Sequence, residues 1–312
     1  MRVVVLGGAG FVGSHLVDRL LGRGDEVVAV DNFLTGNRRH AGLHRNDPRY
    51  TFVEHDICRP IPVIGPAQAV FNLASPASPI DYARLPLETL DVGSLGTRNA
   101  LDLARMAGAT LVHASTSEVY GDPLVHPQRE DYFGNVNTLG PRACYDEAKR
   151  FSEALITTYA RVHGTRFQIA RIFNTYGPRM RVDDGRVVPA FVTQALRGED
   201  FTVFGDGSQT RSFCYVDDLV AGLLALLERG DQQPVNLGNP VEMTLIEFAD
   251  AVRAAVGKGG AVRSVRPLPE NDPKQRRPDI TRARTLLGWQ PRVALAEGLA
   301  PTVAYFREQL GL

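Results

Sequence analysis

Three glycines near the start of the chain constrain its fold most. Gly7, Gly10 and Gly13 stand where a valine-rich run at 2–6 ends and a helical pattern of apolar residues at 11–21 begins. Glycines at this spacing between a strand and a helix allow a tight turn. They also let a pyrophosphate approach the free N–H groups at the helix N-terminus. We therefore expect a dinucleotide-binding βαβ unit, and a glycine turn that binds nothing is the less favoured interpretation.

An acidic residue, Asp31, ends the next predicted strand at 26–30. A carboxylate at that place can accept hydrogen bonds from the ribose hydroxyls of adenosine, and it repels a 2′-phosphate. The sequence therefore favours NAD over NADP as the cofactor. Asp56 follows the third predicted strand and could face the adenine, although a capping role at a strand end explains it equally well.

Strands and helices alternate through the first half of the chain. Further strands are predicted at 50–53, 69–73, 110–113 and 167–172, and helices at 86–107 and 142–163. This alternation predicts the α/β class, with a Rossmann-type doubly wound parallel sheet covered by helices on both faces.

The pattern changes after about residue 177, where loops become rich in Gly, Pro and Arg. Helices are predicted there at 187–197, 217–228, 244–256 and 294–310. We expect a first domain over 1–177 with returning segments at about 211–240. A smaller α/β domain is expected over 178–210 and 241–312.

The composition narrows the possible partners. With 35 basic and 35 acidic residues and a formal net charge of zero, no polyanion-binding surface is expected, so neither nucleic acid nor membrane is a predicted partner. Cys58, Cys144 and Cys214 show no disulfide or metal-ligand spacing, which is typical of a reducing compartment. The longest apolar stretch, 219–227, is too short to span a bilayer, and no secretory signal pattern opens the chain. A soluble, cytoplasmic protein without a metal site is the expectation.

Tyr145 and Lys149 lie four residues apart in a predicted helix, so their side chains share one face. A nearby ammonium, together with the positive charge of a nicotinamide ring, would lower the pKa of the tyrosine and make it a general acid–base. A chance surface pair is the competing interpretation. The chain has only three lysines among its 35 basic residues, the others being Lys258 and Lys274, and this scarcity favours a functional lysine.

Hydroxyl groups and a carboxylate follow the strand predicted at 110–113. Ser115, Thr116, Ser117 and Glu118 come at its carboxyl end, which is where ligands of open α/β sheets bind. The hydroxyls could bind a substrate oxygen beside Tyr145, and Glu118 could transfer a proton or orient water.

Together these residues resemble the extended short-chain dehydrogenase/reductase family. The likeness also covers Asn72–Ala74 and the run RIFNTYGP at 171–178. It implies NAD as cofactor, a nucleotide sugar as substrate held mainly by the smaller domain, and a homodimer packed through the helices at 86–107 and 142–163. Before Gly96 the family often has an asparagine where this chain has Gly93.

The resemblance also implies sets of site residues. Cofactor contacts would come from Gly7, Gly10, Phe11, Val12, Gly13, Asp31, Asn32, Phe33, Thr35, Gly36, Asp56, Ile57, Leu73, Ser75, Ser115, Tyr145, Lys149 and Arg186. Substrate contacts would come from Tyr82, Arg142, Asn174, Thr202, Phe204, Arg211 and Arg276. The catalytic group would be Tyr145, Lys149, Glu118, Thr116, Ser117 and Arg276.

Four segments resemble one subgroup more closely, the members that decarboxylate UDP-glucuronate to UDP-xylose. They read NLASPASP from residue 72, STSEVYGDP from 115, GPRACYDE from 140 and DGRVV from 184. The implied reaction oxidises the sugar at C4, loses carbon dioxide from the resulting β-keto acid, and reduces C4 again, so that the cofactor is recycled. A 4-epimerase or a 4,6-dehydratase on the same scaffold is the alternative. A dehydratase would carry an aspartate where Ser117 stands.

The arginine at 276 has an ambiguous register. It falls in the run KQRRPD, where either Arg276 or Arg277 could match the family arginine that approaches the sugar. Tyr82 and Arg142 are candidate contacts to the substrate carboxylate, with surface or packing roles equally open.

Overall fold

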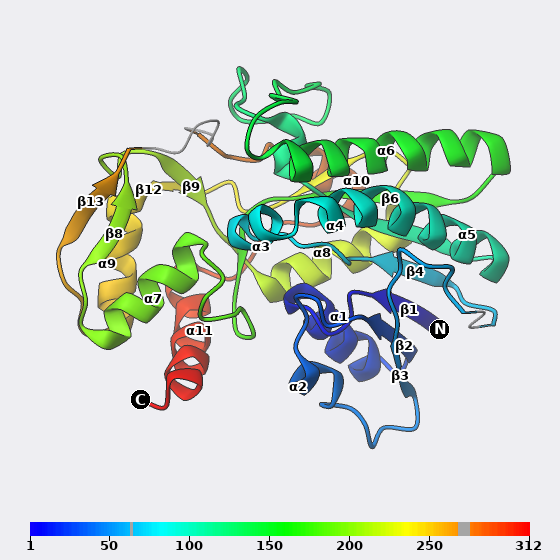
Figure 1. Cartoon of the computed structure of the whole chain (residues 1–312), viewed down its shortest axis with the longest axis horizontal. Coiled ribbons are helices and arrows are strands. Elements are labelled where there is room, and N and C mark those ends of the chain that lie inside the picture. Colours follow the sequence, from blue (N-terminus) through cyan, green and yellow to red (C-terminus); the bar gives the residue numbers. More distant parts are fainter. Residues whose placement is uncertain (63–64, 268–274) are drawn as a thin grey trace.

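A seven-stranded parallel sheet forms the centre of the protein (Figure 1). The computed structural model describes residues 1–62, 65–267 and 275–312. The strand order is β11-β6-β5-β4-β1-β2-β3, with every neighbouring pair parallel. The strands are β1 (Arg2–Leu6), β2 (Glu26–Asp31), β3 (Tyr50–Glu54), β4 (Ala69–Asn72), β5 (Thr110–Thr116), β6 (Phe167–Ile172) and β11 (Val235–Leu237). The predicted Rossmann-type fold is confirmed.

Helices cover both faces of this sheet, and alternate residues of β1 show how. Val3 and Val5 pack into one core with α1 (Phe11–Gly22) and α8 (Val216–Arg229). Val4 and Leu6 face the opposite core, with α5 (Thr97–Ala107) and α6 (Ala143–His163). A strand buried on both faces reads as a continuous apolar run, as residues 2–6 do.

The helix predicted at 86–107 is interrupted. It consists of α4 (Pro86–Asp91), a π-helical turn at Val92–Gly96, and α5. A Cβ atom on Gly93 would lie 2.7 Å from Cβ of Ala148 on α6, and Ser152 donates a hydrogen bond of 2.7 Å to the Gly93 carbonyl. Gly93 therefore allows α6 to approach closely beside Lys149, where the asparagine common in the family would collide with Ala148.

A smaller layer of short strands and helices lies beside the sheet, on the left in Figure 1. Its strand pairs are β8 (Phe201–Phe204) with β13 (Val262–Arg266) and β9 (Thr210–Ser212) with β12 (Glu242–Thr244). Its helices are α7 (Val187–Arg197), α9 (Leu245–Val256) and α11 (Leu295–Leu310). β7 (Thr175–Tyr176) pairs with β10 (Cys214–Tyr215) between the two parts.

Three short helices were not predicted from the sequence. They are α2 (Arg38–Ala41), α3 (Pro79–Arg84) and α10 (Thr281–Leu287). α10 packs against α8 and β11 of the large sheet. Lys274 lies outside the described residues.

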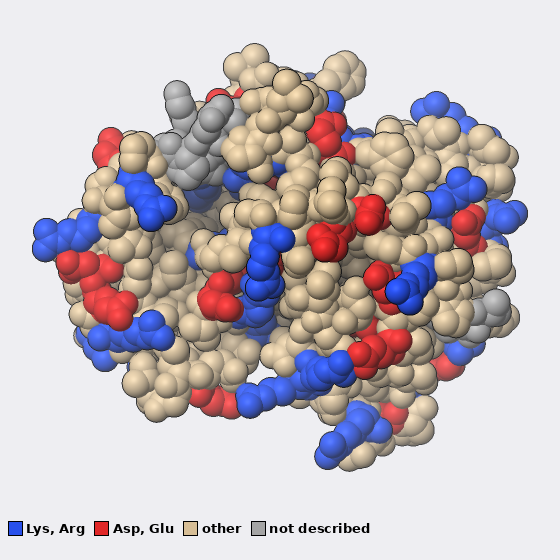
Figure 2. Space-filling view, in the orientation of Figure 1, with Lys and Arg blue, Asp and Glu red and all other residues tan. Residues whose placement is uncertain are grey.

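Charged side chains of both signs are interspersed over the face seen in Figure 2. Among the residues that the structure describes, none of the helices is both long and apolar enough to cross a membrane.

Candidate active site

A cavity opens at the carboxyl ends of β1, β2 and β4. The glycine loop, the end of β2 and the segment after β4 line it. Of the predicted cofactor residues, those in its wall are Gly7, Gly10, Asp31, Asn32, Thr35, Gly36, Asp56, Ile57, Leu73 and Ser75. The wall also contains residues that were not predicted: Val30, Leu34, His55, Cys58, Ala74, Pro76, Glu88, Asp91 and Val92.

The glycine loop is packed so tightly that its glycines are required. A Cβ atom on Gly7, where φ is +80°, would lie 2.8 Å from the Ala74 nitrogen, and one on Gly13 would lie 2.0 Å from the Gly7 carbonyl oxygen. Gly10, just before α1, offers no side-chain cap to the first helical N–H groups. This open cradle, with its uncapped helix N-terminus, fits the pyrophosphate of NAD.

Asp31 joins the glycine loop to the end of β2. Its two carboxylate oxygens accept hydrogen bonds from the backbone nitrogens of Ala9 at 3.0 Å and Phe33 at 2.8 Å. Burial raises the pKa of Asp31. The carboxylate is thus fixed in the cavity wall, where it suits the adenosine ribose.

Some predicted cofactor residues point elsewhere. Phe33 stacks on Phe52 at 5.2 Å between ring centroids, and the Arg38 guanidinium lies 4.1 Å above the Phe33 ring. The Ser115 hydroxyl donates to Glu153 at 2.5 Å. Phe11, Val12 and Gly13 form the first turn of α1 and are not in the cavity wall.

Tyr145 and Lys149 lie on the first turns of α6, within the helix predicted for them, and both are buried. The Lys149 ammonium donates to the Ala114 carbonyl at 2.9 Å and lies 5.9 Å from the centre of the Tyr145 ring. Burial lowers the pKa of Lys149 to about 8. Lys149 therefore ties α6 to β5 at the edge of the site.

The pKa of Tyr145 is set mainly by burial. Burial raises it to about 12, although a hydrogen bond with Thr116 and the charge of Arg186 act in the opposite direction. In the chain without bound cofactor, desolvation of the phenolate outweighs these two effects; the lowering expected from Lys149 and a nicotinamide charge together stays a prediction for the NAD complex.

Glu118 lies between two guanidinium groups. It sits in the 3₁₀ turn Ser117–Tyr120, which Thr116 caps, and is 7% exposed. Arg142 donates to it at 2.5 Å, and Arg276 pairs with both of its oxygens at 2.7 and 2.9 Å. Burial would raise the pKa of Glu118, but the charges of Arg276 and Arg142 lower it overall, so this buried carboxylate is ionised at neutral pH.

Arg276 and Arg277 differ in their contacts. Arg276 is buried, reaches Glu118, and approaches the Asn174 amide oxygen at 3.4 Å. The Arg277 backbone N–H instead donates to the Gln128 side-chain Oε1 at 2.8 Å, and its carbonyl accepts from the Gln128 backbone N–H at 2.9 Å. Arg276 is therefore the arginine that faces the site.

Other predicted substrate residues surround this centre at different distances. Tyr82 stacks on Tyr145, with centroids 5.1 Å apart and an angle of 12° between the rings, and Arg142 lies 5.9 Å from the centre of the Tyr82 ring. Arg211 is buried on β9, and its charge lowers the pKa of Glu118.

Two predicted residues of β8 lie further out, whereas Arg186, before α7, is near enough for its charge to act on Tyr145. Thr202 and Phe204 are on the exposed face of β8, and Phe204 is 45% exposed. Arg186 precedes α7 and pairs with Asp184 at 2.5 and 2.8 Å.

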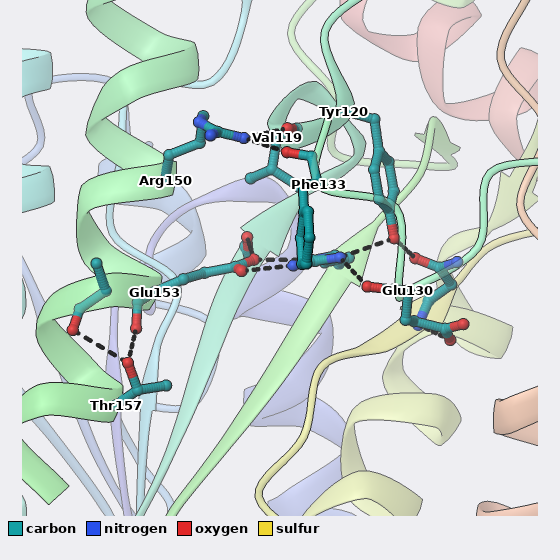
Figure 3. Close-up of polar contacts among 11 residues, drawn as sticks. Val119, Tyr120, Glu130, Phe133, Arg150, Glu153 and Thr157 are labelled. Carbon is teal, nitrogen blue, oxygen red and sulfur yellow. Dashed lines mark hydrogen bonds and ion pairs between the residues drawn. The ribbon is translucent and has the colours of Figure 1, made fainter. Parts of the chain in front are cut away.

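A partly buried polar network behind the site was not predicted (Figure 3). Glu153 on α6 accepts hydrogen bonds from Ser115 on β5 and pairs through both oxygens with Arg171 on β6, at 3.0 and 2.8 Å. Arg171 continues to the Tyr120 hydroxyl at 3.1 Å, and Tyr120 donates to Asn236 at 2.7 Å. The network fixes α6, which carries Tyr145 and Lys149, against the strand that leads to Thr116 and Glu118.

A dinucleotide cradle and a buried Tyr–Lys pair, both at the carboxyl edge of one parallel sheet, define a nicotinamide-dependent enzyme of the short-chain dehydrogenase type. Comparison with known families agrees. The chain belongs to the NAD-dependent epimerase/dehydratase family, whose model matches residues 3–238.

Named relatives are similar over nearly the whole chain. UDP-glucuronic acid decarboxylase 4 of Arabidopsis thaliana is 52% identical over 99% of this chain and 69% of its own length. UDP-glucuronic acid decarboxylase 1 of Xenopus tropicalis is 50% identical over 99% of this chain and 73% of its own.

Solved structures of enzymes with other activities share the fold. UDP-glucuronic acid 4-epimerase from Bacillus cereus, crystallised with UDP-glucuronic acid and NAD, is 28% identical with a TM-score of 0.87, covering 99% of this chain and 100% of that one. A dTDP-glucose 4,6-dehydratase from Streptomyces venezuelae with NAD bound is 29% identical with a TM-score of 0.90, covering 100% and 98% of the two chains.

Proposed function

We propose that this protein is an NAD-dependent carboxy-lyase that converts UDP-glucuronate to UDP-xylose. The observation that carries the proposal is the pair of arginines, Arg142 and Arg276, that converge on Glu118 beside Tyr145. They form a buried cationic site suited to a substrate carboxylate. The 52% and 50% identical relatives bear the name of this activity.

The chain's own residues divide the work around C4 and C5 of the sugar. The glycine loop and Asp31 would hold NAD, which when bound supplies the hydride acceptor and donor for C4. Tyr145 would take the proton from the C4 hydroxyl and later return it to the same oxygen, and Thr116, its hydrogen-bond partner, would hold that oxygen. Arg142 and Arg276 would orient the carboxylate, and Ser117 and Glu118 the ring and its water.

The substrate chemistry explains why a ketone at C4 is needed. The ketone makes the carboxylate at C5 a β-keto acid, so the electron pair of the C5–C6 bond can pass into an enolate as carbon dioxide leaves. The low dielectric around Tyr145 and Glu118 strengthens every charge interaction that the buried residues make with this enolate. Asn174 and Arg211 would bind the diphosphate, Thr202 and Phe204 the base, and Tyr82 the sugar.

Incubation of the protein with UDP-glucuronate and NAD tests the proposal. We expect carbon dioxide and a UDP-pentose in equal amounts, with no net formation of NADH. UDP-galacturonate as the sole product would instead establish a 4-epimerase, and a UDP-4-keto-6-deoxy sugar from UDP-glucose would establish a dehydratase.

We also propose a homodimer formed through α4, α5 and α6, which lie beside one another in Figure 1. Large apolar side chains are exposed on these helices and the turn between them: Leu87 by 70%, Leu95 by 54%, Met106 by 59%, Phe151 by 51% and Val162 by 69%. Such a concentration of apolar surface is typical of an interface.

Sedimentation at micromolar concentration tests the dimer. The native chain should sediment as a dimer, and the double variant Leu87→Arg/Phe151→Arg as a monomer, because two buried charges per subunit would oppose association. Val241→Arg is a matched control, since Val241 is 61% exposed on a different part of the surface. A monomeric native chain would contradict the proposal.

We further propose that 1–177, with returning segments at about 211–240, binds the cofactor, and that 178–210 and 241–312 bind the nucleotide sugar. A cytoplasmic location is part of the proposal, supported by the free thiols of Cys58, Cys144 and Cys214.

A further inference from the structure

Asp146 has no part in the mechanism above, yet it lies beside the centre of the site. It follows Tyr145 directly on α6 and is 7% exposed. Its Oδ1 atom is buried without a hydrogen-bond partner. A buried polar atom in this state costs free energy, so its presence calls for a functional reason.

A second cavity lies in front of Asp146. The loop from β5 to α6 lines it, with Gly121, Asn135 and Gly140 in the wall, and Arg142 and Asp146 belong to the same wall. Arg142 reaches from this cavity to Glu118, at 2.5 Å. The cavity therefore has in one wall both Asp146 and the arginine that contacts Glu118.

The charges around Asp146 set its protonation. Burial, followed by the negative charge of Glu118, raises the pKa of Asp146 to about 7, while Arg142 and Arg276 act in the opposite direction. The two carboxyl groups thus differ in protonation state. Glu118 is held ionised, whereas Asp146 carries a proton over much of the pH range below neutrality. The titratable and charged groups that face Asp146 or share its cavity are Glu118, Asp122, Arg142, Arg276, Glu147, Tyr82, Cys144 and Tyr145.

The proposed reaction consumes one proton in each turnover. Tyr145 returns to O4 the proton that it takes, so it makes no net contribution. Loss of carbon dioxide leaves the electron pair in the C4–C5 enolate. C5 must then gain a proton, and the enolate electrons form the new C5–H bond as the C4 ketone is restored. Glu118, ionised between two guanidinium groups, has no proton to give.

We propose that Asp146 is the source of the proton that C5 receives, passed through water in the cavity that Asp146 and Arg142 line. The Asp146 carboxylate is then reprotonated from solvent through the same cavity. This inference rests on the proposed decarboxylation. It assigns the acid that the reaction requires to a residue on the same helix as the tyrosine base.

The variant Asp146→Asn tests the assignment in deuterium oxide. The native enzyme should give UDP-xylose with one deuterium at C5 in a single configuration. Asp146→Asn should lower kcat about 10²-fold, the usual share of a general acid, and give both C5 configurations, because unguided water protonates either face. Asp146→Glu should restore part of the rate. Glu147→Gln is the matched control, since Glu147 is its half-buried neighbour on α6 and pairs with Arg150.

The pH profile of the native enzyme gives a second readout that survives if Asp146→Asn fails to fold. The acid form of Asp146 is the active one, so kcat should fall as pH rises above about 7. A flat kcat from about pH 6 to about pH 9, or an Asp146→Asn variant with native kcat and a single C5 configuration, would overturn the inference. A native enzyme that releases no carbon dioxide would overturn the proposed function instead.

Discussion

Tyr145→Phe is expected to lower kcat by about 10³-fold while binding of NAD and the UDP-sugar stays within a factor of about two. The change removes one hydroxyl, the group that would carry the C4 proton. The ring itself would remain, still stacked on Tyr82 with centroids 5.1 Å apart. The pocket should therefore keep its shape and lose only its proton-transfer group.

Steady-state kinetics and calorimetric titration with UDP check this expectation. Tyr159→Phe provides the control, because Tyr159 is on the same helix and its hydroxyl binds Asp102 at 2.5 Å, outside the site. That variant should retain the native kcat. If Tyr145→Phe kept more than about a tenth of the native kcat, Tyr145 would not be the acid–base group.

The sequence predicted the local features of the fold and the site. Six of the seven strands were recognisable because they are short apolar runs between helices with a clear period, whereas β11, only three residues long, was not predicted. The glycine loop, Asp31, and the Tyr145–Lys149 pair depend on spacing within a few residues, so they too were recognisable.

Features that depend on distant contacts could not be predicted. Glu153 and Arg171 look like ordinary charged residues until β6 and α6 are placed side by side. Ser115 turns to Glu153 for the same reason. The raised pKa of Asp146 depends on its burial and on the negative charge of Glu118, and both arise only in the tertiary fold.

The pKa of Tyr145 shows a second limit of prediction from sequence spacing. Spacing correctly placed an ammonium nearby, but it could not show how deeply the phenol is buried. Desolvation, which sequence patterns do not report, determines the sign of the shift.

Arg276→Met is expected to lower kcat/KM for UDP-glucuronate by about 10³-fold, equivalent to about 4 kcal/mol, which is within the range for removing one member of a buried charge pair. Arg276 pairs with both oxygens of Glu118, at 2.7 and 2.9 Å. Its loss would remove one of the two guanidinium groups proposed to hold the substrate carboxylate. It would also leave Arg142 as the ion-pair partner of Glu118 that remains among the described residues.

The loss of the Arg276 guanidinium should also lower the stability of the protein without bound substrate. Glu118 has a lowered pKa in the folded chain, so its ion pairs stabilise the fold above the unfolded pKa, and this contribution is lost as pH falls through the folded pKa. In Arg276→Met the pKa of Glu118 should rise. The melting temperature should then fall most at neutral pH, and the gap from the native protein should narrow on acidification.

Arg277→Met separates a role of Arg276 from a general effect on the segment. The hydrogen bonds of Arg277 to Gln128 use backbone atoms, so this variant should keep the segment in place and its kcat/KM within about twofold of native. Kinetics with UDP-glucuronate and melting curves at several pH values make both comparisons. Equal losses in the two variants would show that the segment, and not the Arg276 guanidinium, is what the site requires.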